Sequence, residues 1–137
     1  MTKEQLKAYK DIKREWVDIS RRIEELEAAM YGPRSQQLDG MPHGGAGSND
    51  VREEQIERKA ELLAMYRAKE AELDAALVEI EKAIEKLTPR ERRLVRLHYV
   101  DGLTWEQVCV EMVYSWPQVH RIHAAALKSL REENATQ

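Results

Sequence analysis

The side chains with the most distinctive chemistry in this sequence are gathered between Ser115 and Arg121. Gln118 stands three residues after Ser115 and Arg121 a further three, so both fall in the first two turns of a helix that Ser115 would cap. At the start of a helix in the DNA major groove, Arg can donate two hydrogen bonds to guanine and Gln can pair with adenine. We expect Gln118 and Arg121 to read base edges, with Trp116 and His120 in support.

Positive charge is concentrated around this segment, although the chain as a whole has a formal net charge of −3. No acid occurs at 115–131, whereas 1–87 holds fifteen Lys or Arg against nineteen Asp or Glu. We expect Lys128 to meet phosphate or solvent. Four arginines flank the motif and are expected to hold the phosphate backbone without reading sequence, unless they form only a solvated face. They are Arg90, Arg92, Arg93 and Arg96.

Three capping boxes in succession indicate the elements that position these residues. They are Thr88-x-x-Glu91, Thr104-x-x-Gln107 and Ser115-x-x-Gln118. They predict three helices, at about 89–101, 105–112 and 116–132. Gly102 is placed to end the first of them. The second is barely two turns long and is joined to the third by a tight turn, which is typical of a helix-turn-helix.

The apolar residues of these three helices fit one trihelical core. The residues expected to face inward are Leu94, Val95, Leu97, Val108, Cys109, Met112, Val119, Ile122, Ala126, Leu127 and Leu130. Cys109 supplies the small side chain needed where the second and third helices cross, so we interpret it as structural rather than redox-active or metal-binding. Trp105 and Trp116 have an alternative role in packing, against the rest of the chain or a second copy.

Before residue 88, apolar residues spaced alternately by three and four predict two long helices. In the first, from about Thr2 to Tyr31, they are Tyr9, Ile12, Trp16, Ile19, Ile23, Leu26 and Met30. In the second, which continues to Leu87, they are Ile56, Leu63, Tyr66, Leu73, Leu77, Ile80, Ile84 and Leu87, with Lys59 and Glu70 as charged members of the series. Neither narrow stripe can be buried by one helix, so we expect an antiparallel coiled-coil hairpin.

The two helices are separated at 32–49 by a segment rich in Gly and Pro, and Ser48, Asn49 or Asp50 is expected to cap the second helix. A connection of this length is either disordered or binds a partner, and Met41-Pro42-His43 would be its ordered part.

The expected fold is therefore all-α, with a hairpin domain at 1–87 and a helix-turn-helix DNA-binding domain at 88–137. Because two narrow seams make a thin core, we expect a homodimer or a higher homo-oligomer, or docking onto another protein. A monomeric hairpin capped by the C-terminal module is the alternative.

Other kinds of chemistry lack a matching pattern. His120 and His123 could share a helix face, but zinc would need two further ligands, so we expect no metal and no cofactor. No arrangement of nucleophile and base indicates an enzyme, and we expect no catalytic residue. No apolar run approaches the ~20 residues of a membrane span, and the N-terminus lacks the pattern of a signal peptide. We expect a cytoplasmic protein without a membrane partner.

The stretch from Leu87 to Val108 and the ending Ser115…Val119-x-Arg121-Ile122…Ala126-Leu127-x-x-Leu130 resemble the fourth region of bacterial sigma factors. A closer resemblance is to small prophage-encoded regulators of the ArpU and RinA type, which pair an N-terminal helical segment with a sigma-like helix-turn-helix. The Ser115-x-x-Gln-Val-x-Arg-Ile-His run and the Asp39-Gly-Met-Pro-His-Gly segment carry that likeness. It implies binding of double-stranded DNA and activation of phage late genes, with bacterial RNA polymerase as a further partner.

The sequence departs from the sigma pattern at two places. Sigma factors carry charged residues just after the Ser cap, whereas this chain has Trp116 and Pro117, which argues against an ordinary sigma-type promoter element. Val113 stands where Gly is common in the turn, and a positive φ there would strain a β-branched residue, so a different turn is expected.

Two other functions fit the same elements. A DNA-packaging component similar to a small terminase subunit also joins a helix-turn-helix to an oligomerising helical region, and ring-shaped assembly would favour it. An interaction protein that binds RNA polymerase or an anti-sigma partner without touching DNA is the third possibility.

Overall fold

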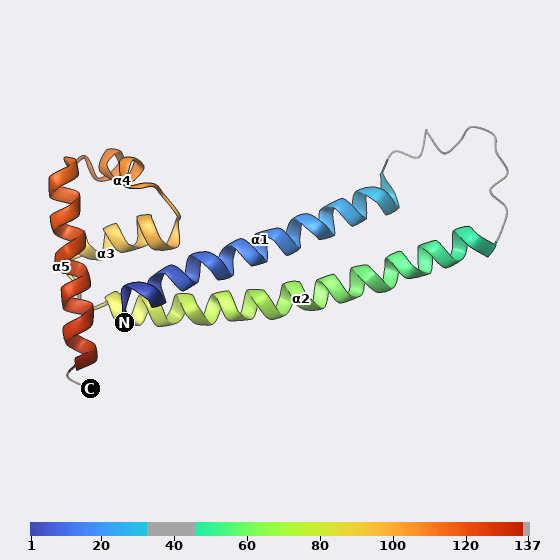
Figure 1. Cartoon of the computed structure of the whole chain (residues 1–137), viewed down its shortest axis with the longest axis horizontal. Helices are drawn as coiled ribbons and strands as arrows, with labels where there is room; N and C mark the ends of the chain where they lie inside the picture. The colour runs from blue at the N-terminus through green and yellow to red at the C-terminus, as the bar shows by residue number, and fades with distance from the viewer. Residues whose placement is uncertain (33–45, 136–137) are drawn as a thin grey trace. The chain divides into compact units, whose positions relative to one another are not determined.

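The computed structural model describes residues 1–32 and 46–135, and their regular structure is entirely helical (Figure 1). Two long helices, α1 (Lys3–Tyr31) and α2 (Ala46–Ile84), precede four short elements. These are α3 (Pro89–Val95), the π-helical turn η2 (Arg96–Val100), α4 (Trp105–Met112) and α5 (Trp116–Ala135). Within the described residues, no helix combines the length and apolar composition that crossing a membrane requires.

The chain forms two compact units, each of which contains part of the hairpin. The first unit comprises Met1–Lys13 and Glu72–Gln137, and the second unit comprises Arg14–Ala71. The first unit therefore includes the first turns of α1 and the last turns of α2 together with the C-terminal helices. The division into domains at 87 and 88 stays a prediction.

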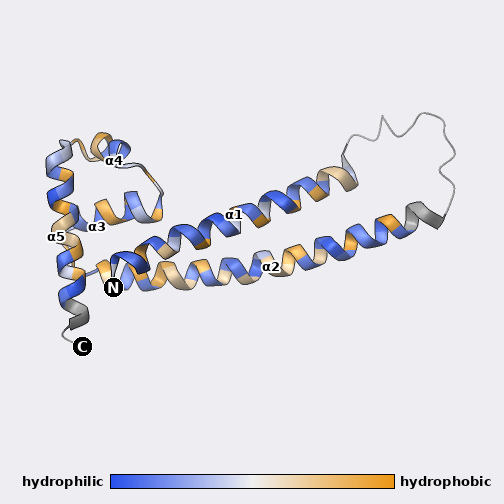
Figure 2. Ribbon diagram, viewed as in Figure 1, coloured by the Kyte–Doolittle hydropathy of each residue, from blue (hydrophilic) through white to orange (hydrophobic). Residues whose placement is uncertain are grey.

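In the second unit, α1 and α2 pair in antiparallel fashion. Trp16 stacks on Tyr66 with ring centroids 5.4 Å apart, and Glu15 forms an ion pair of 2.8 Å with Lys69. Farther along α1, Glu27 forms an ion pair with Lys59 at 3.4 Å. Later residues of α1 thus contact earlier residues of α2, which is the order of an antiparallel pair. Apolar and polar bands alternate along both helices, as the hairpin seam requires (Figure 2).

Most of the predicted seam is buried or half-buried, but Ile56 is not. Its side chain is 51% exposed, and that of Val51 is 55% exposed. The pairing explains why, because the partner of Ile56 would lie at the end of α1, where Tyr31 closes the helix. The charged member Lys59 is accommodated by its bond to Glu27 and by the Tyr31 ring, whose centroid lies 5.2 Å from its Nζ.

The start of α2 also differs from expectation. The helix begins at Ala46, so Ser48, Asn49 and Asp50 lie inside it and are not its N-cap. The first four amides of a helix have no partner within it, whichever residue comes first, so its first turn tolerates small polar residues. The segment Met41-Pro42-His43, together with the question of disorder or partner binding, lies outside the described residues.

In the first unit, α3, α4 and α5 surround the predicted trihelical core. Leu94, Val108 and Val119 are fully buried and Met112 nearly so, one or more from each helix. Residues that pack partly buried against this cluster include Leu97, Cys109 and Ile122. The arrangement of three short helices, with α4 and α5 joined by a tight turn, is that of a helix-turn-helix (Figure 1).

The caps predicted from the sequence form as expected. Thr104 and Gln107 make a reciprocal capping box, and the Thr88 hydroxyl accepts from the amide of Glu91 at 3.3 Å. The helix that begins at Pro89 continues as the wider π-helical turn η2 and ends there. In this turn the Asp101 amide donates to the Arg96 carbonyl, five residues earlier. Gly102 follows with φ +77°, a left-handed conformation that suits glycine and stops the helix.

The turn between α4 and α5 corrects one expectation. Val113 adopts φ 58° and ψ 46°, the left-handed conformation, and the turn is not of a different kind. The Tyr114 amide closes it by donating to the Cys109 carbonyl at 3.1 Å. A β-branched residue is costly in this conformation, so the turn geometry is imposed by the packing of the helices on either side of it.

Candidate nucleic-acid interface

The start of α5 is fixed by a reciprocal cap between Ser115 and Gln118. The Ser115 amide donates to Gln118 Oε1 at 2.9 Å, and the Gln118 amide donates to Ser115 Oγ at 3.4 Å. Ser115 Oγ also donates to Gln118 Oε1 at 3.0 Å. The side-chain oxygen of Gln118 is therefore engaged in the cap. Pairing with adenine uses both the oxygen and the nitrogen of the amide, so a base-reading Gln118 would have to exchange the cap for DNA.

Arg121 lies on the exposed face of α5, one turn after Pro117. Its Nε donates to the Pro117 carbonyl at 3.3 Å, which leaves the two terminal nitrogens to form a fork with a ligand. Lys128 is exposed seven residues later, on the same face of the helix. The structure thus brings two of the expected DNA-binding cations onto one stripe of α5.

Trp116 and His120 lie together at one edge of this face. Their rings are 4.4 Å apart, and the His120 ring also lies 5.4 Å from that of Trp105. Trp116 is half-exposed, whereas the Nε2 atom of His120 is buried without a hydrogen-bond partner among the described residues. His120 is thus part of a packed aromatic cluster and is only partly exposed, whereas Trp116 has the larger free surface toward a ligand.

The aromatic cluster continues into the core and was not evident from the sequence. His98 stacks on Trp105 at 3.7 Å, and its Nδ1 donates to the Leu103 carbonyl at 2.8 Å. Beneath it, a buried hydrogen bond of 2.6 Å joins Tyr99 Oη and His123 Nε2. The only sequence signal was the abundance of aromatic and His residues between His98 and His123, because the widening at η2 that brings them together has no local signature.

Burial keeps these histidines neutral. It lowers the pKa of His123 to about 4, with smaller contributions from the positive charge of Lys3 and from His98 and His120. Burial also lowers the pKa of His98, which the hydrogen bond to Leu103 partly offsets, and raises the pKa of Tyr99 to about 12. Neutral, packed rings hold α4 against α5 and η2, and do not supply charge for binding phosphate.

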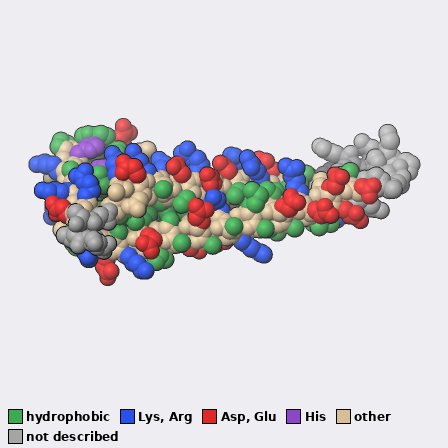
Figure 3. All heavy atoms as spheres, turned by 60° about the horizontal axis from the view of Figure 1, so that its bottom comes forward, with side chains coloured by type: hydrophobic (Ala, Val, Ile, Leu, Met, Phe, Trp, Pro, Cys, Tyr) green, Lys and Arg blue, Asp and Glu red, His purple; other side chains and the backbone are tan. Residues whose placement is uncertain are grey.

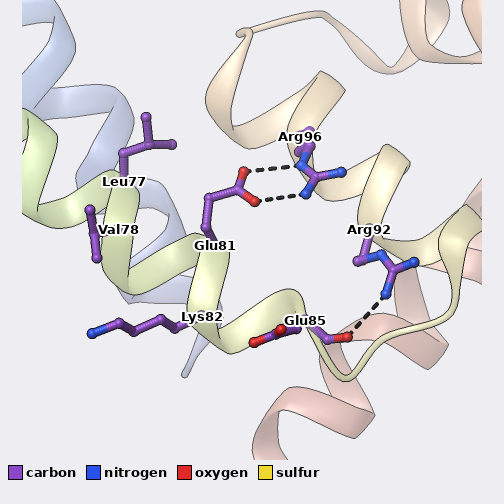
Figure 4. A pocket seen from close by; sticks show the side chains of 7 residues that line it. All are labelled: Leu77, Val78, Glu81, Lys82, Glu85, Arg92 and Arg96. Atoms are coloured by element: carbon purple, nitrogen blue, oxygen red, sulfur yellow. Dashed lines mark hydrogen bonds and ion pairs between the residues drawn. The ribbon is translucent and has the colours of Figure 1, made fainter.

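The four flanking arginines separate into two pairs. Arg92 Nη1 donates to the carbonyls of Glu85 and Leu87 at 3.0 and 3.1 Å, and Arg96 forms a two-pronged ion pair with Glu81 at 3.0 and 2.7 Å (Figure 4). The Arg96 hydrogen bond lowers the pKa of the Glu81 carboxyl. This pair joins α3 and η2 to the last turns of α2 and to the residues that follow it, and a contact of either arginine with phosphate stays a prediction.

The other pair faces the helix-turn-helix itself. Arg93 Nη2 donates weakly to the Glu111 carbonyl at 3.4 Å, near the end of α4. The Arg90 guanidinium lies 5.6 Å from the centroid of the Tyr114 ring. Arg90 is exposed and Tyr114 is partly exposed, so both side chains can contact a ligand. Arg90 and Arg121 line one groove of about 520 Å³ between the start of α3 and α5, together with Ile122. The groove brings these two predicted DNA contacts together.

Comparison with known proteins adds a family likeness at this site. Residues 83–132 match the family described as sigma-70, region 4, a span that contains α3, η2, α4 and most of α5. Neither the curated proteins nor the solved structures contain a match to the chain. The C-terminal part of this chain is therefore a helix-turn-helix similar to region 4 of sigma-70 factors, a likeness that supports DNA binding in transcription.

Proposed function

We propose that this protein binds double-stranded DNA in a sequence-specific manner through α5 and regulates transcription, as a prophage regulator of the ArpU and RinA type. The observation that carries the proposal is the face of α5 that bears Arg121 and Lys128. It is exposed, it belongs to a stretch without acids from Ser115 to Arg131, and it stands on a helix-turn-helix similar to sigma region 4. An acid-free helix can approach the phosphates on both sides of the major groove without repulsion.

Arg121 is the residue on which base recognition depends in this proposal. Its two terminal nitrogens have the geometry for a fork to guanine, an interaction worth roughly 1–3 kcal/mol of discrimination. Arg121→Ala should therefore weaken binding to the specific site by about 5- to 150-fold. Binding to unrelated DNA should fall much less, because phosphate contacts dominate it.

The test is a fluorescence-anisotropy titration of the purified protein on fragments from its own genomic neighbourhood, at two salt concentrations. Arg67→Ala serves as the matched control, because this exposed arginine lies on α2 in the second unit. Saturable binding to one fragment, weakened by Arg121→Ala and unaffected by Arg67→Ala, supports the proposal. Absence of binding even at low salt refutes the proposal and favours a protein that binds only protein partners.

The regulator proposal also includes an assembly surface on the hairpin, for a second copy or for RNA polymerase. Apolar side chains that are about half-exposed support this part. They are Val17, Val51, Ile56 and Met65. Sedimentation analysis separates the alternatives, because a dimer fits a regulator that covers one promoter-proximal site. A closed ring would favour the DNA-packaging function, and a monomer that captures RNA polymerase would favour docking.

A further inference from the structure

The first turns of α1 are built into the same compact unit as the helix-turn-helix. Leu6 is fully buried there and Tyr9 nearly so. The Met1 ammonium donates to the Leu130 carbonyl on α5 at 3.4 Å, and Lys13 Nζ donates to the Val100 carbonyl at 3.1 Å. Side chains on these turns of α1 therefore hold a defined position beside α5.

Three lysines form a stripe on this part of α1. Lys3, Lys7 and Lys10 stand at i, i+4 and i+7, so they fall within about 60° of the helix circumference. All three are exposed, and among the described residues none has an ion-pair or hydrogen-bond partner. Glu4 and Asp11 border the stripe, three residues before and four residues after Lys7, and the charge of Glu4 helps to raise the pKa of Tyr99. Between Lys3 and Arg14, five Lys or Arg stand against these two acids, so the stripe is a local concentration of positive charge in an acidic chain.

The lysine stripe lies on the side of α5 that carries the aromatic cluster. The charges of Lys10, Lys3 and Lys7 help to lower the pKa of His98, and Lys3 does the same for His123 on α5. The contact of Met1 with Leu130, which lies seven residues after His123 on the same face of α5, places this part of α1 on the same side. The charge interactions agree with that placement, because all three lysines act on His98 and Lys3 also acts on His123. Figure 3 shows Lys and Arg side chains beside the His side chains at this end of the first unit.

Arg90 lies on the opposite side of α5. It shares its groove with Ile122, two residues after His120, and residues two apart on a helix face directions about 160° apart. The exposed stripe with Arg121 runs between these two sides. Cations from α3 and from α1 therefore lie on the two sides of α5. A helix seated in a major groove about 12 Å wide has a phosphate backbone on each side.

We propose that Lys3, Lys7 and Lys10 form a second DNA-contacting surface, which binds the phosphate backbone along the His120 side of α5. This inference rests on the proposed DNA-binding function. It makes the N-terminal helix, as well as the helix-turn-helix, part of the DNA interface. The lysines would add affinity and dependence on salt without selecting sequence, because phosphates carry no base information.

The test is the triple variant Lys3→Gln/Lys7→Gln/Lys10→Gln, titrated on specific and unrelated DNA over a range of salt concentrations. Each phosphate contact contributes about 0.9 to the slope of log affinity against log salt, so the slope should decrease in magnitude by about 2.7. Affinity should fall by a similar factor for both DNAs. The matched control is Arg52→Gln/Arg58→Gln/Arg67→Gln, which removes equal charge from exposed positions of α2.

Thermal melting establishes that the triple variant is folded, and the single variants, each expected to lower the slope by about 0.9, replace it if it is not. A slope unchanged by the lysine substitutions, or lowered equally by the arginine control, overturns the inference. If Arg121→Ala weakens DNA binding but the lysine variant binds with the affinity and salt slope of the wild type, the proposed function is supported and the lysine surface is refuted. If the wild type does not bind DNA, both fail.

Discussion

Val113 offers a direct test of whether tertiary packing imposes the turn of the helix-turn-helix. Its φ of 58° is left-handed, which costs an L-residue about 1–2 kcal/mol and is least suited to a β-branched one. The side chain is 85% exposed, so replacing it removes little burial, worth a few tenths of a kcal/mol at most. Asn tolerates this conformation much better than Val.

Val113→Asn should therefore stabilise the protein by about 0.5–1 kcal/mol, with a rise in Tm of about 2–6 °C. Val113→Gly removes the same strain but adds unfolded-state entropy of about 0.5–1 kcal/mol, so its gain should be smaller. The assay is reversible urea unfolding, in which the midpoint should rise while the slope stays constant. DNA affinity should not change, because the turn keeps its geometry.

Val110→Asn is the matched control for this prediction. Val110 is also exposed, at 76%, but it lies within α4 where the backbone is right-handed. Val and Asn have similar helix propensities, so the same chemical change there should leave stability within a few tenths of a kcal/mol. If Val113→Asn is no more stable than Val110→Asn, the argument that the turn stores strain is wrong.

Two further predictions concern the interior of the first unit. His123 is protonated near pH 6.5 in the unfolded chain and only near pH 4 in the folded protein. The stability contributed by neutral His123 should therefore be fully present above pH 6.5, and the free energy of unfolding should fall by up to about 3 kcal/mol as the pH drops toward 4. Urea midpoints at several pH values measure this loss, and an equal loss in His123→Gln would contradict the assignment. Leu6→Ala, at a fully buried site, should cost about 2–5 kcal/mol and unfold the helix-turn-helix together with α1. Val17→Ala, at a half-exposed site, should cost far less, and an unchanged melting of the C-terminal helices in Leu6→Ala would show that α1 is not part of their unit.

The sequence by itself determined the features that depend on neighbours along the chain. Hydroxyl and amide side chains three residues apart, such as Thr104 with Gln107 and Ser115 with Gln118, give helix starts because the hydrogen bonds they satisfy are local. The apolar period likewise predicted the hairpin seam, and the spacing of helices predicted the helix-turn-helix. The Thr2 and Gln5 pair makes a further reciprocal cap, which the same local pattern would have indicated.

Tertiary structure decided which partner each long side chain takes. Four similar arginines stand within seven residues, yet Arg92 and Arg96 bind the end of α2 while Arg90 and Arg93 face the helix-turn-helix, since helix rotation sends them to different neighbours. Val113 shows the same limit, because a local preference against a positive φ is overridden when helices packed on both sides require that turn. The first turns of α1 belong to the same compact unit as the C-terminal helices, where Leu6 is fully buried and the Met1 ammonium donates to the Leu130 carbonyl. Only folding brings together residues this far apart in the chain.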